Sequence, residues 1–189
     1  MKITPNHLTW FRLAVAPVVP LVFIHDGYAY KWIACSIYTA AALTDLLDGI
    51  LARRRQQITV LGKILDPIAD KVLILGALGA LAVDGVLNFW WLIPILLREI
   101  SVTIARLLLI PKNQIVAAQK SGKIKVVIQH VTIFFFFLLS LRLHAAEGLF
   151  TNVLFVLAYG TLTLAVWFTL KSGYDFFAAN GAALIGRKV

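Results

Sequence analysis

The stretch "TDLLDGILARRRQQITVLGKILDPIAD", residues 44–70, decides how this chain folds. It places four of the nine acidic residues of the protein inside two apolar segments that flank an arginine-rich turn. The four are Asp45, Asp48, Asp66 and Asp70. A carboxylate in an apolar helix is costly unless something compensates its charge, so the stretch indicates a functional site.

The composition of the chain is typical of a membrane protein. Of its 189 residues 60% are hydrophobic and 14% are charged, and the mean hydropathy is +0.86. Soluble domains average about 45–50% apolar and about 25% charged residues. We therefore predict an all-α integral membrane protein that forms a single domain over residues 1–189.

Six segments reach the length of about 20 residues that crosses a bilayer. They are residues 8–24, 32–52, 62–83, 89–110, 123–141 and 149–170. Only the last is free of charge; the other five reach spanning length by including ionisable side chains. The phenylalanine run at 134–137 is expected to face lipid. The sequence thus predicts six transmembrane helices with charge inside the membrane.

Lysine and arginine are distributed unevenly between the two sets of connections. One set of loops and ends carries Lys2, Arg53, Arg54, Arg55, Lys63, Lys112, Lys120, Lys171, Arg187 and Lys188. The other carries only Lys31 and Arg142. This bias predicts that both termini, and a polar cavity near the first set, face the cytoplasm. Much of the net charge of +9 is then explained by topology, and no nucleic-acid partner is expected.

The spacing of the aspartates places each pair on one helical face. Asp45 and Asp48 are three residues apart, and Asp66 and Asp70 are four apart. Antiparallel neighbours would present the pairs at matched depths, the deeper pair roughly 10–12 Å below the interface. Four carboxylates so close oppose one another's ionisation, and one or two divalent cations would relieve this. Oxygen ligands favour Mg²⁺ or Mn²⁺.

Two other interpretations of the aspartates remain open. The carboxylates could form a buried ionic network with Arg53 and Lys71, although four carboxylates exceed those two partners. They could also line a proton or cation pathway. Such a pathway usually places polar groups across the whole membrane depth, whereas the outer halves of the six predicted spans are almost without charge.

The residues also spell a known pattern: Asp45-x-x-Asp48-Gly49-x-x-Ala52-Arg53, then Gly62-x-x-x-Asp66-x-x-x-Asp70. This pattern resembles the signature of the CDP-alcohol phosphotransferase family. The stretches "TPNHLTWFR", "LDPIADK", "LLREISVTIAR" and "AAQKSGKIK" further resemble bacterial phosphatidylglycerophosphate synthases over roughly residues 3–130, and "SGYDFF" is also similar. The last two spans match only in hydropathy. Members transfer the phosphate-bearing group of a CDP-activated donor to an alcohol and release CMP.

The resemblance implies a role for each signature residue. Asp45, Asp48, Asp66 and Asp70 would hold two Mg²⁺ or Mn²⁺ ions, and Asp70 would also be the catalytic base on the incoming hydroxyl. The residues that would contact CDP-diacylglycerol are Asn6, Thr9, Gly49, Arg53 and Thr59. Without the resemblance, Asn6 and Thr9 would be interpreted as interfacial caps, and Gly49 equally as a helix-packing residue.

A basic region downstream is a candidate site for the acceptor. Arg98 lies near the middle of the fourth predicted span, and Arg106 shares a helical face with Glu99 and Thr103. Both arginines are expected to be too deep for a topological role, with Glu99 as their counter-ion. Arg98, Arg106, Lys123 and Lys125 would suit an acceptor that carries phosphate, such as sn-glycerol 3-phosphate.

Together these expectations describe a phosphatidyltransferase in the cell inner (cytoplasmic) membrane. It would transfer the phosphatidyl group of CDP-diacylglycerol to glycerol 3-phosphate by in-line displacement, giving phosphatidylglycerophosphate and CMP. The family also implies a homodimer within membrane lipid. The alternatives are the same chemistry with inositol phosphate, phosphatidylglycerol (giving cardiolipin) or serine, or a non-enzymatic cation-binding membrane protein.

Overall fold

The computed structural model describes residues 12–55, 60–109, 120–143 and 148–184. Within these ranges the side chains of residues 45–55, 60–67, 107, 120, 121, 123, 182 and 183 are not described. The regular structure of the described ranges is entirely helical: α2 (Val18–Phe23), α3 (Tyr28–Arg55), α4 (Val60–Val83), the 3₁₀ turn η1 (Phe89–Trp91), α5 (Leu92–Leu109), α6 (Lys120–Leu143) and α7 (Leu149–Leu184). The prediction of an all-α protein is confirmed for this part of the chain.

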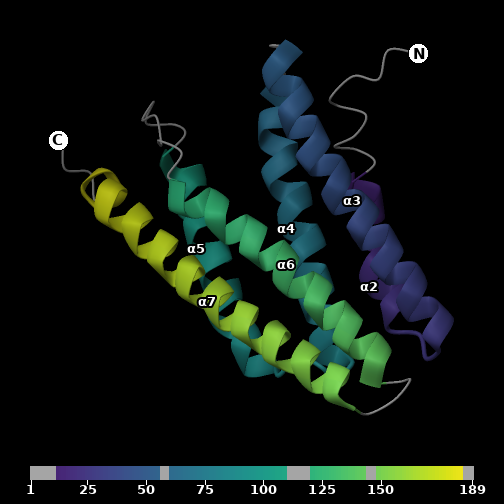
Figure 1. Cartoon of the computed structure of the whole chain (residues 1–189). Helices are drawn as coiled ribbons and strands as arrows, with labels where there is room; N and C mark the ends of the chain where they lie inside the picture. The colour runs from purple at the N-terminus through teal and green to yellow at the C-terminus, as the bar shows by residue number, and fades with distance from the viewer. Residues whose placement is uncertain (1–11, 56–59, 110–119, 144–147, 185–189) are drawn as a thin grey trace.

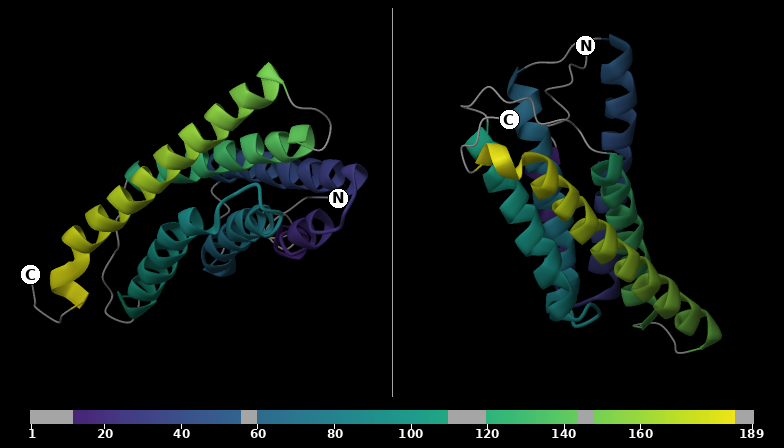
Figure 2. Two further views of the ribbon diagram at one scale, coloured as in Figure 1. Left: turned by 90° about the horizontal axis from the view of Figure 1, so that it is seen from below. Right: turned by 90° about the vertical axis from the view of Figure 1, so that its left-hand side faces the viewer.

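The helices form two layers (Figure 2). Helices α3, α6 and α7 make one layer, and α2, α4 and α5 make the other. Contacts of α2 with α3, of α4 with α6 and of α5 with α7 join the layers. Successive long helices run in opposite directions, so that α3 ends and α4 begins at the upper end in Figure 1. We call this the aspartate end.

Two prolines shorten the first helical segment. Residues 12–15 are helical, a turn follows at 16–17, and α2 begins after Pro17. Pro20 has no N–H to donate to the carbonyl of Ala16, and its ring crowds that carbonyl, so an uninterrupted helix is disfavoured there. The segment continues far enough toward the aspartate end to place Arg12 against α4.

The turn after α4 depends on a glycine. Gly85 has a φ of +79°, a left-handed conformation that glycine adopts without strain. The Leu87 N–H donates to the carbonyl of Leu81 at 3.1 Å, which satisfies a carbonyl of the last helical turn. This turn brings Asp84 against Lys31 of α3 and Ser140 of α6.

The apolar core lies between the two layers. Leu73, Leu78 and Leu81 of α4 are fully buried there, beside Phe136 and Phe137 of α6. The expectation that all of residues 134–137 face lipid is therefore wrong for these two phenylalanines. Helix α6 has α3, α4 and α7 as neighbours, so little of its circumference remains outside the bundle.

Two helical stretches of the described residues are long and apolar enough to cross a bilayer. They are Ile124–Leu143 in α6 and Leu149–Gly181 in α7. The helices α3, α4 and α5 lie where the sequence predicts spans, but they carry ionisable residues, which lower their hydropathy. Six transmembrane helices therefore stay a prediction.

Candidate functional site

The aspartate pairs lie at matched distances from the aspartate end. Asp45 precedes the last residue of α3, Arg55, by ten positions, and Asp70 follows the first residue of α4, Val60, by ten. At 1.5 Å per residue both lie about 15 Å from their helix ends. Asp48 and Asp66 lie about 10 Å from the same ends. The helix bounds thus agree with two carboxylate levels on antiparallel helices.

Asp70 is the member of the quartet whose side chain is described, and it contacts Arg12. The Arg12 Nη1 donates to Asp70 Oδ1 at 2.9 Å. The Arg12 side chain is buried, whereas that of Asp70 is partly open. A buried guanidinium stabilises the charged form of a neighbouring carboxylate and fixes its orientation. The first helical segment therefore contacts α4 at the predicted base, Asp70.

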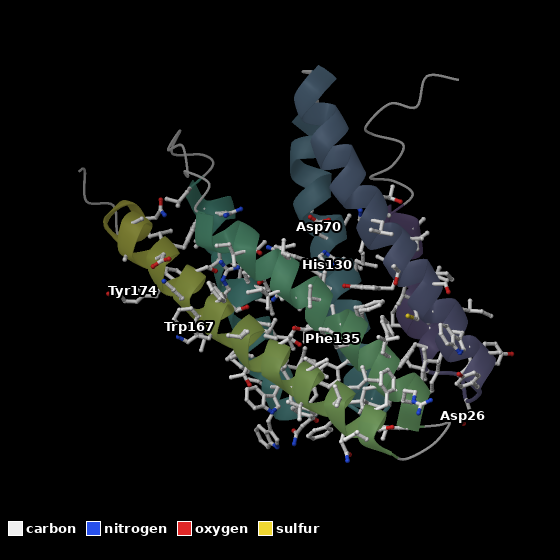
Figure 3. The ribbon with its side chains drawn as sticks, viewed as in Figure 1. Asp26, Asp70, His130, Phe135, Trp167 and Tyr174 are labelled. Atoms are coloured by element: carbon white, nitrogen blue, oxygen red, sulfur yellow. The ribbon has the colours of Figure 1, made fainter. Side chains whose placement is uncertain are left out.

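A second polar pair lies near Asp70. The Tyr38 hydroxyl of α3 and His130 Nδ1 of α6 form a hydrogen bond of 2.7 Å. Tyr38 is within electrostatic range of Asp70. Figure 3 shows Asp70 and His130 in the same part of the bundle, with Asp26 at the opposite end. Tyr38 and His130 join α3 to α6 beside the aspartates.

The residue after Asp70 belongs to a basic cluster. Lys71 Nζ donates to Thr103 Oγ1 of α5, and Thr103 Oγ1 donates to the carbonyl of Glu99 at 2.6 Å. Lys125 of α6 pairs with Glu99 Oε1, and Arg98 pairs with the same oxygen at 3.2 Å. We call Lys71, Arg98, Glu99, Thr103 and Lys125 the basic cluster. Two cations contact the Glu99 carboxylate, and the third, Lys71, lies within its electrostatic range.

Helix α7 closes the basic cluster on its outer side. Arg98 Nη2 donates to Ser172 Oγ at 2.6 Å, and Gln129 Nε2 of α6 donates to Thr169 Oγ1 at 3.3 Å. Ser172, Thr169 and Gln129 are all buried. Hydrogen bonds therefore link α4, α5, α6 and α7 at one level of the bundle.

The acceptor residues predicted from sequence are not all brought together. Arg98 and Lys125 meet at Glu99, which confirms Glu99 as a counter-ion but with Lys125 in place of Arg106. Arg106 is exposed in the last turn of α5, with its guanidinium 5.8 Å from the Phe176 ring, so it lies apart from Glu99, and its depth in the membrane stays a prediction. Lys123 lies in the first turns of α6, and its side chain is not described.

The predicted donor contacts fall in the parts that the structure leaves undescribed. Asn6, Thr9 and Thr59 lie outside the described residues. Gly49 and Arg53 lie in the last turns of α3, and their side chains are not described. These five assignments stay predictions.

Sequence reasoning gave no functional role to several residues that the structure places here. Arg12 was visible as a charge in the first apolar segment, which is a signal of function. Lys71 follows a signature aspartate directly. The contact between Tyr38 and His130 spans 92 residues of sequence and has no sequence signal.

The donor set of the aspartate site suits a hard cation. Carboxylate oxygens from α3 and α4 are the ligands that Mg²⁺ and Mn²⁺ prefer. Among the side chains that the structure describes, no group of three or more possible ligands occurs, since the side chains of Asp45, Asp48 and Asp66 are outside that set. The fit therefore depends on the ligand chemistry and the matched helix positions.

Comparison with known proteins places the chain in a family. Residues 2–171 match the family model described as CDP-alcohol phosphatidyltransferase, so the similarity continues through the last two predicted spans. A probable phosphatidylglycerophosphate synthase of Mycobacterium tuberculosis is 37% identical over 177 residues, 92% of this chain and 79% of the relative. A CDP-diacylglycerol–glycerol-3-phosphate 3-phosphatidyltransferase of Bacillus subtilis is 33% identical over 192 residues, 95% of this chain and 96% of the relative. One of Rickettsia typhi with the same name is 31% identical over 180 residues, covering 95% and 97%. The aspartate pattern, its place on two antiparallel helices and these matches agree: the chain belongs to the CDP-alcohol phosphatidyltransferase family.

Proposed function

We propose that this protein transfers the phosphatidyl group of CDP-diacylglycerol to sn-glycerol 3-phosphate, giving phosphatidylglycerophosphate and CMP. One observation carries the proposal. Asp70 and Lys71 are successive residues of α4, and they contact different partners, Arg12 and Thr103. The two side chains leave the same turn of α4 in different directions, one toward an acidic site suited to a metal-bound pyrophosphate and one toward a basic cluster suited to an anionic acceptor. The names of the relatives support the same reaction.

On the donor side, the aspartates of α3 and α4 would hold two Mg²⁺ or Mn²⁺ ions. Bound there, the ions would neutralise the pyrophosphate of the donor and the charge that develops on CMP. Gly49 would let the nucleotide approach the backbone of α3, and Arg53 would bind a phosphate. Asn6, Thr9 and Thr59 would complete the nucleotide contacts. The acyl chains would remain in lipid.

On the acceptor side, the excess of cations is the main support. Arg98 and Lys125 contact Glu99, a single carboxylate, and Lys71 lies within electrostatic range of it. Burying unbalanced positive charge is unfavourable, and a phosphate group would restore the balance. Lys123 and the exposed Arg106 would attract the acceptor at the entrance to this cluster.

The reaction itself needs one proton transfer from the acceptor. The acceptor hydroxyl oxygen would bond to the phosphorus that carries diacylglycerol, while the bond from that phosphorus to the CMP oxygen breaks. The bonding electrons leave with CMP, and Asp70 accepts the hydroxyl proton. Arg12 would hold Asp70 in the orientation that this transfer requires. No covalent enzyme intermediate is needed.

We place the protein in the inner (cytoplasmic) membrane as a multi-pass protein with the aspartate end toward the cytoplasm. The lysines and arginines of the sequence gather at the connections of that end, as the positive-inside rule requires. Both termini would then lie in the cytoplasm. Exposed apolar side chains such as Phe155, Val156 and Leu164 on α7 would face lipid. The homodimer implied by the family is part of the same proposal.

An acceptor screen tests the proposal. Purified protein is given CDP-diacylglycerol with glycerol 3-phosphate, inositol phosphate, phosphatidylglycerol or serine, and CMP release is measured. We expect release with glycerol 3-phosphate, loss on chelation with EDTA, and recovery with Mg²⁺ or Mn²⁺. Release with another acceptor alone would refute the acceptor assignment, and metal-dependent ion flux without donor cleavage would refute the enzyme.

A further inference from the structure

The side chain of Arg98 crosses α7 at a glycine. A Cβ added to Gly173 would lie 3.0 Å from Arg98 Cγ and 3.6 Å from Arg98 Nε. Contacts of 3.0–3.4 Å are tighter than nearly all real Cβ contacts, so one side chain would have to move. Gly160 and Gly181 of the same helix have no other atom within 4 Å of such a Cβ. Gly173 therefore differs from its neighbours in making room for Arg98.

The residue before this glycine holds the end of the same arginine. Arg98 Nη2 donates to Ser172 Oγ at 2.6 Å, and Arg98 Nη1 donates to Glu99 Oε1 at 3.2 Å. The Arg98 side chain is only 10% exposed, and Ser172 is fully buried. The guanidinium is thus fixed on two sides, by α5 and by α7.

The third nitrogen of the guanidinium, Nε, lacks a hydrogen-bond acceptor among the described residues. This nitrogen is buried. An unmet donor of this kind is costly in a folded protein unless a ligand uses it. It lies in a cluster of three cations and one carboxylate, Glu99, so the ligand that suits it is an anion with several acceptor oxygens.

We propose that Ser172 and Gly173 form a positioning element that sets Arg98 for the phosphate of the acceptor and so determines acceptor specificity. This inference depends on the proposed function, because it concerns the acceptor side of the same site. Gly173 sets the path of the aliphatic part of Arg98, and Ser172 sets the orientation of its guanidinium plane. Because the N–H groups of the planar guanidinium must align with the phosphate oxygens, a small displacement of the aliphatic part of Arg98 weakens phosphate binding. The donor does not use this contact.

A matched pair of variants tests the role of Gly173. Gly173→Ala and Gly160→Ala make the same change on the same helix, and only the first meets Arg98. Equilibrium binding of radiolabelled glycerol 3-phosphate is measured together with kcat and KM for CMP release. We expect Gly173→Ala to raise the Kd and KM for glycerol 3-phosphate about tenfold. Gly160→Ala should match the wild type, and the KM for CDP-diacylglycerol should change less than about twofold in both.

A double-mutant cycle separates positioning from a general effect on α7. Arg98→Ala removes the side chain that Gly173 accommodates, so adding Gly173→Ala to it should leave the Kd for glycerol 3-phosphate unchanged. Ser172→Ala removes one hydroxyl and provides a second variant if Gly173→Ala does not fold. It should weaken acceptor binding about threefold to tenfold without changing the melting temperature of the purified protein by more than a few degrees.

The outcomes distinguish this inference from the proposed function. Equal acceptor binding by Gly173→Ala, Ser172→Ala and the wild type overturns the inference while CMP release by the wild type still supports the function. If the wild type binds glycerol 3-phosphate without releasing CMP, and Gly173→Ala weakens that binding, the inference holds and the reaction is refuted. A wild type that binds no glycerol 3-phosphate overturns both.

Discussion

Two buried ionic clusters lie at different levels of this molecule. In the basic cluster, Lys125 of α6 pairs with Glu99 beside Thr103. In the other, Lys31 pairs with Asp84 at 2.5 Å, and Ser140 of α6 accepts from Lys31 at 3.4 Å and donates to Asp84 at 3.0 Å. We call Lys31, Asp84 and Ser140 the opposite cluster. Lys125 and Ser140 are fifteen residues apart, about 22 Å along α6.

The clusters differ in charge balance. The opposite cluster has one cation and one anion, and its serine satisfies both, so it is complete without a ligand. The basic cluster gathers three cations around Glu99 and leaves Arg98 Nε without a partner among the described residues. A buried ion pair with no net charge can join helices without a ligand. A buried cluster with net positive charge is stabilised when an anion binds to it. We therefore expect charge balance, not burial, to separate the structural ion pair from the one proposed to bind substrate.

The largest expected contrast comes from the same substitution at the two levels. Asp70→Asn removes the proposed base, and we expect kcat to fall roughly 10²–10⁴-fold while donor binding persists. Asp84→Asn should leave kcat unchanged and lower the free energy of unfolding by about 1.5–3 kcal/mol, because Lys31 loses a charged partner. CMP release and thermal unfolding in detergent measure both. A near-normal rate for Asp70→Asn would remove it as the base.

Replacing each ion pair with apolar residues should sharpen the contrast. For Lys31→Met/Asp84→Leu we expect activity to persist and the free energy of unfolding to stay equal or rise by about 1–4 kcal/mol, as for buried pairs elsewhere. For Glu99→Leu/Lys125→Met we expect the KM for glycerol 3-phosphate to rise roughly 10–100-fold, because a phosphate contact is lost. If both double variants keep acceptor binding, the two clusters do not differ in role.

A smaller effect is expected at Arg12, for which Arg142 provides a comparison. Arg12 pairs with Asp70, whereas Arg142 lies 5.2 Å from the Phe150 ring at the far end of α6. Arg12→Gln should lower kcat about tenfold, with the KM values for both substrates nearly unchanged, because only the orientation of the base is lost. Arg142→Gln is the control and should keep kcat. Equal kcat values for the two variants would exclude a positioning role for Arg12.

The smallest expected effect is at Arg106. Because this side chain is exposed, its attraction for an anionic acceptor is screened by solvent. We expect Arg106→Ala to raise the KM for glycerol 3-phosphate by no more than about fivefold and to leave the KM for the donor unchanged. The increase should diminish at high ionic strength. A rise as large as that for Arg98→Ala would place Arg106 inside the acceptor site.

Much of the site could be predicted from local sequence. The helix positions of the four aspartates and their matched levels follow from spacings of three and four residues on regular helices. The family match agrees with the aspartate signature. The pairing of Arg106 with Glu99 and the lipid exposure of Phe136 and Phe137 were predicted wrongly, because each depends on which neighbours a helix face meets.

Sequence alone determined the helical class, the apolar segments and the carboxylate spacing, since these depend on hydrophobicity and on the helical repeat. Tertiary structure decided the partners: Arg12 for Asp70, Lys125 for Glu99, and the Ser172–Gly173 site for Arg98. The residues in these contacts are 26 positions apart for Glu99 and Lys125, 58 for Arg12 and Asp70, and 74 for Arg98 and Ser172. No local pattern encodes such pairs, because the packing of whole helices brings their side chains together.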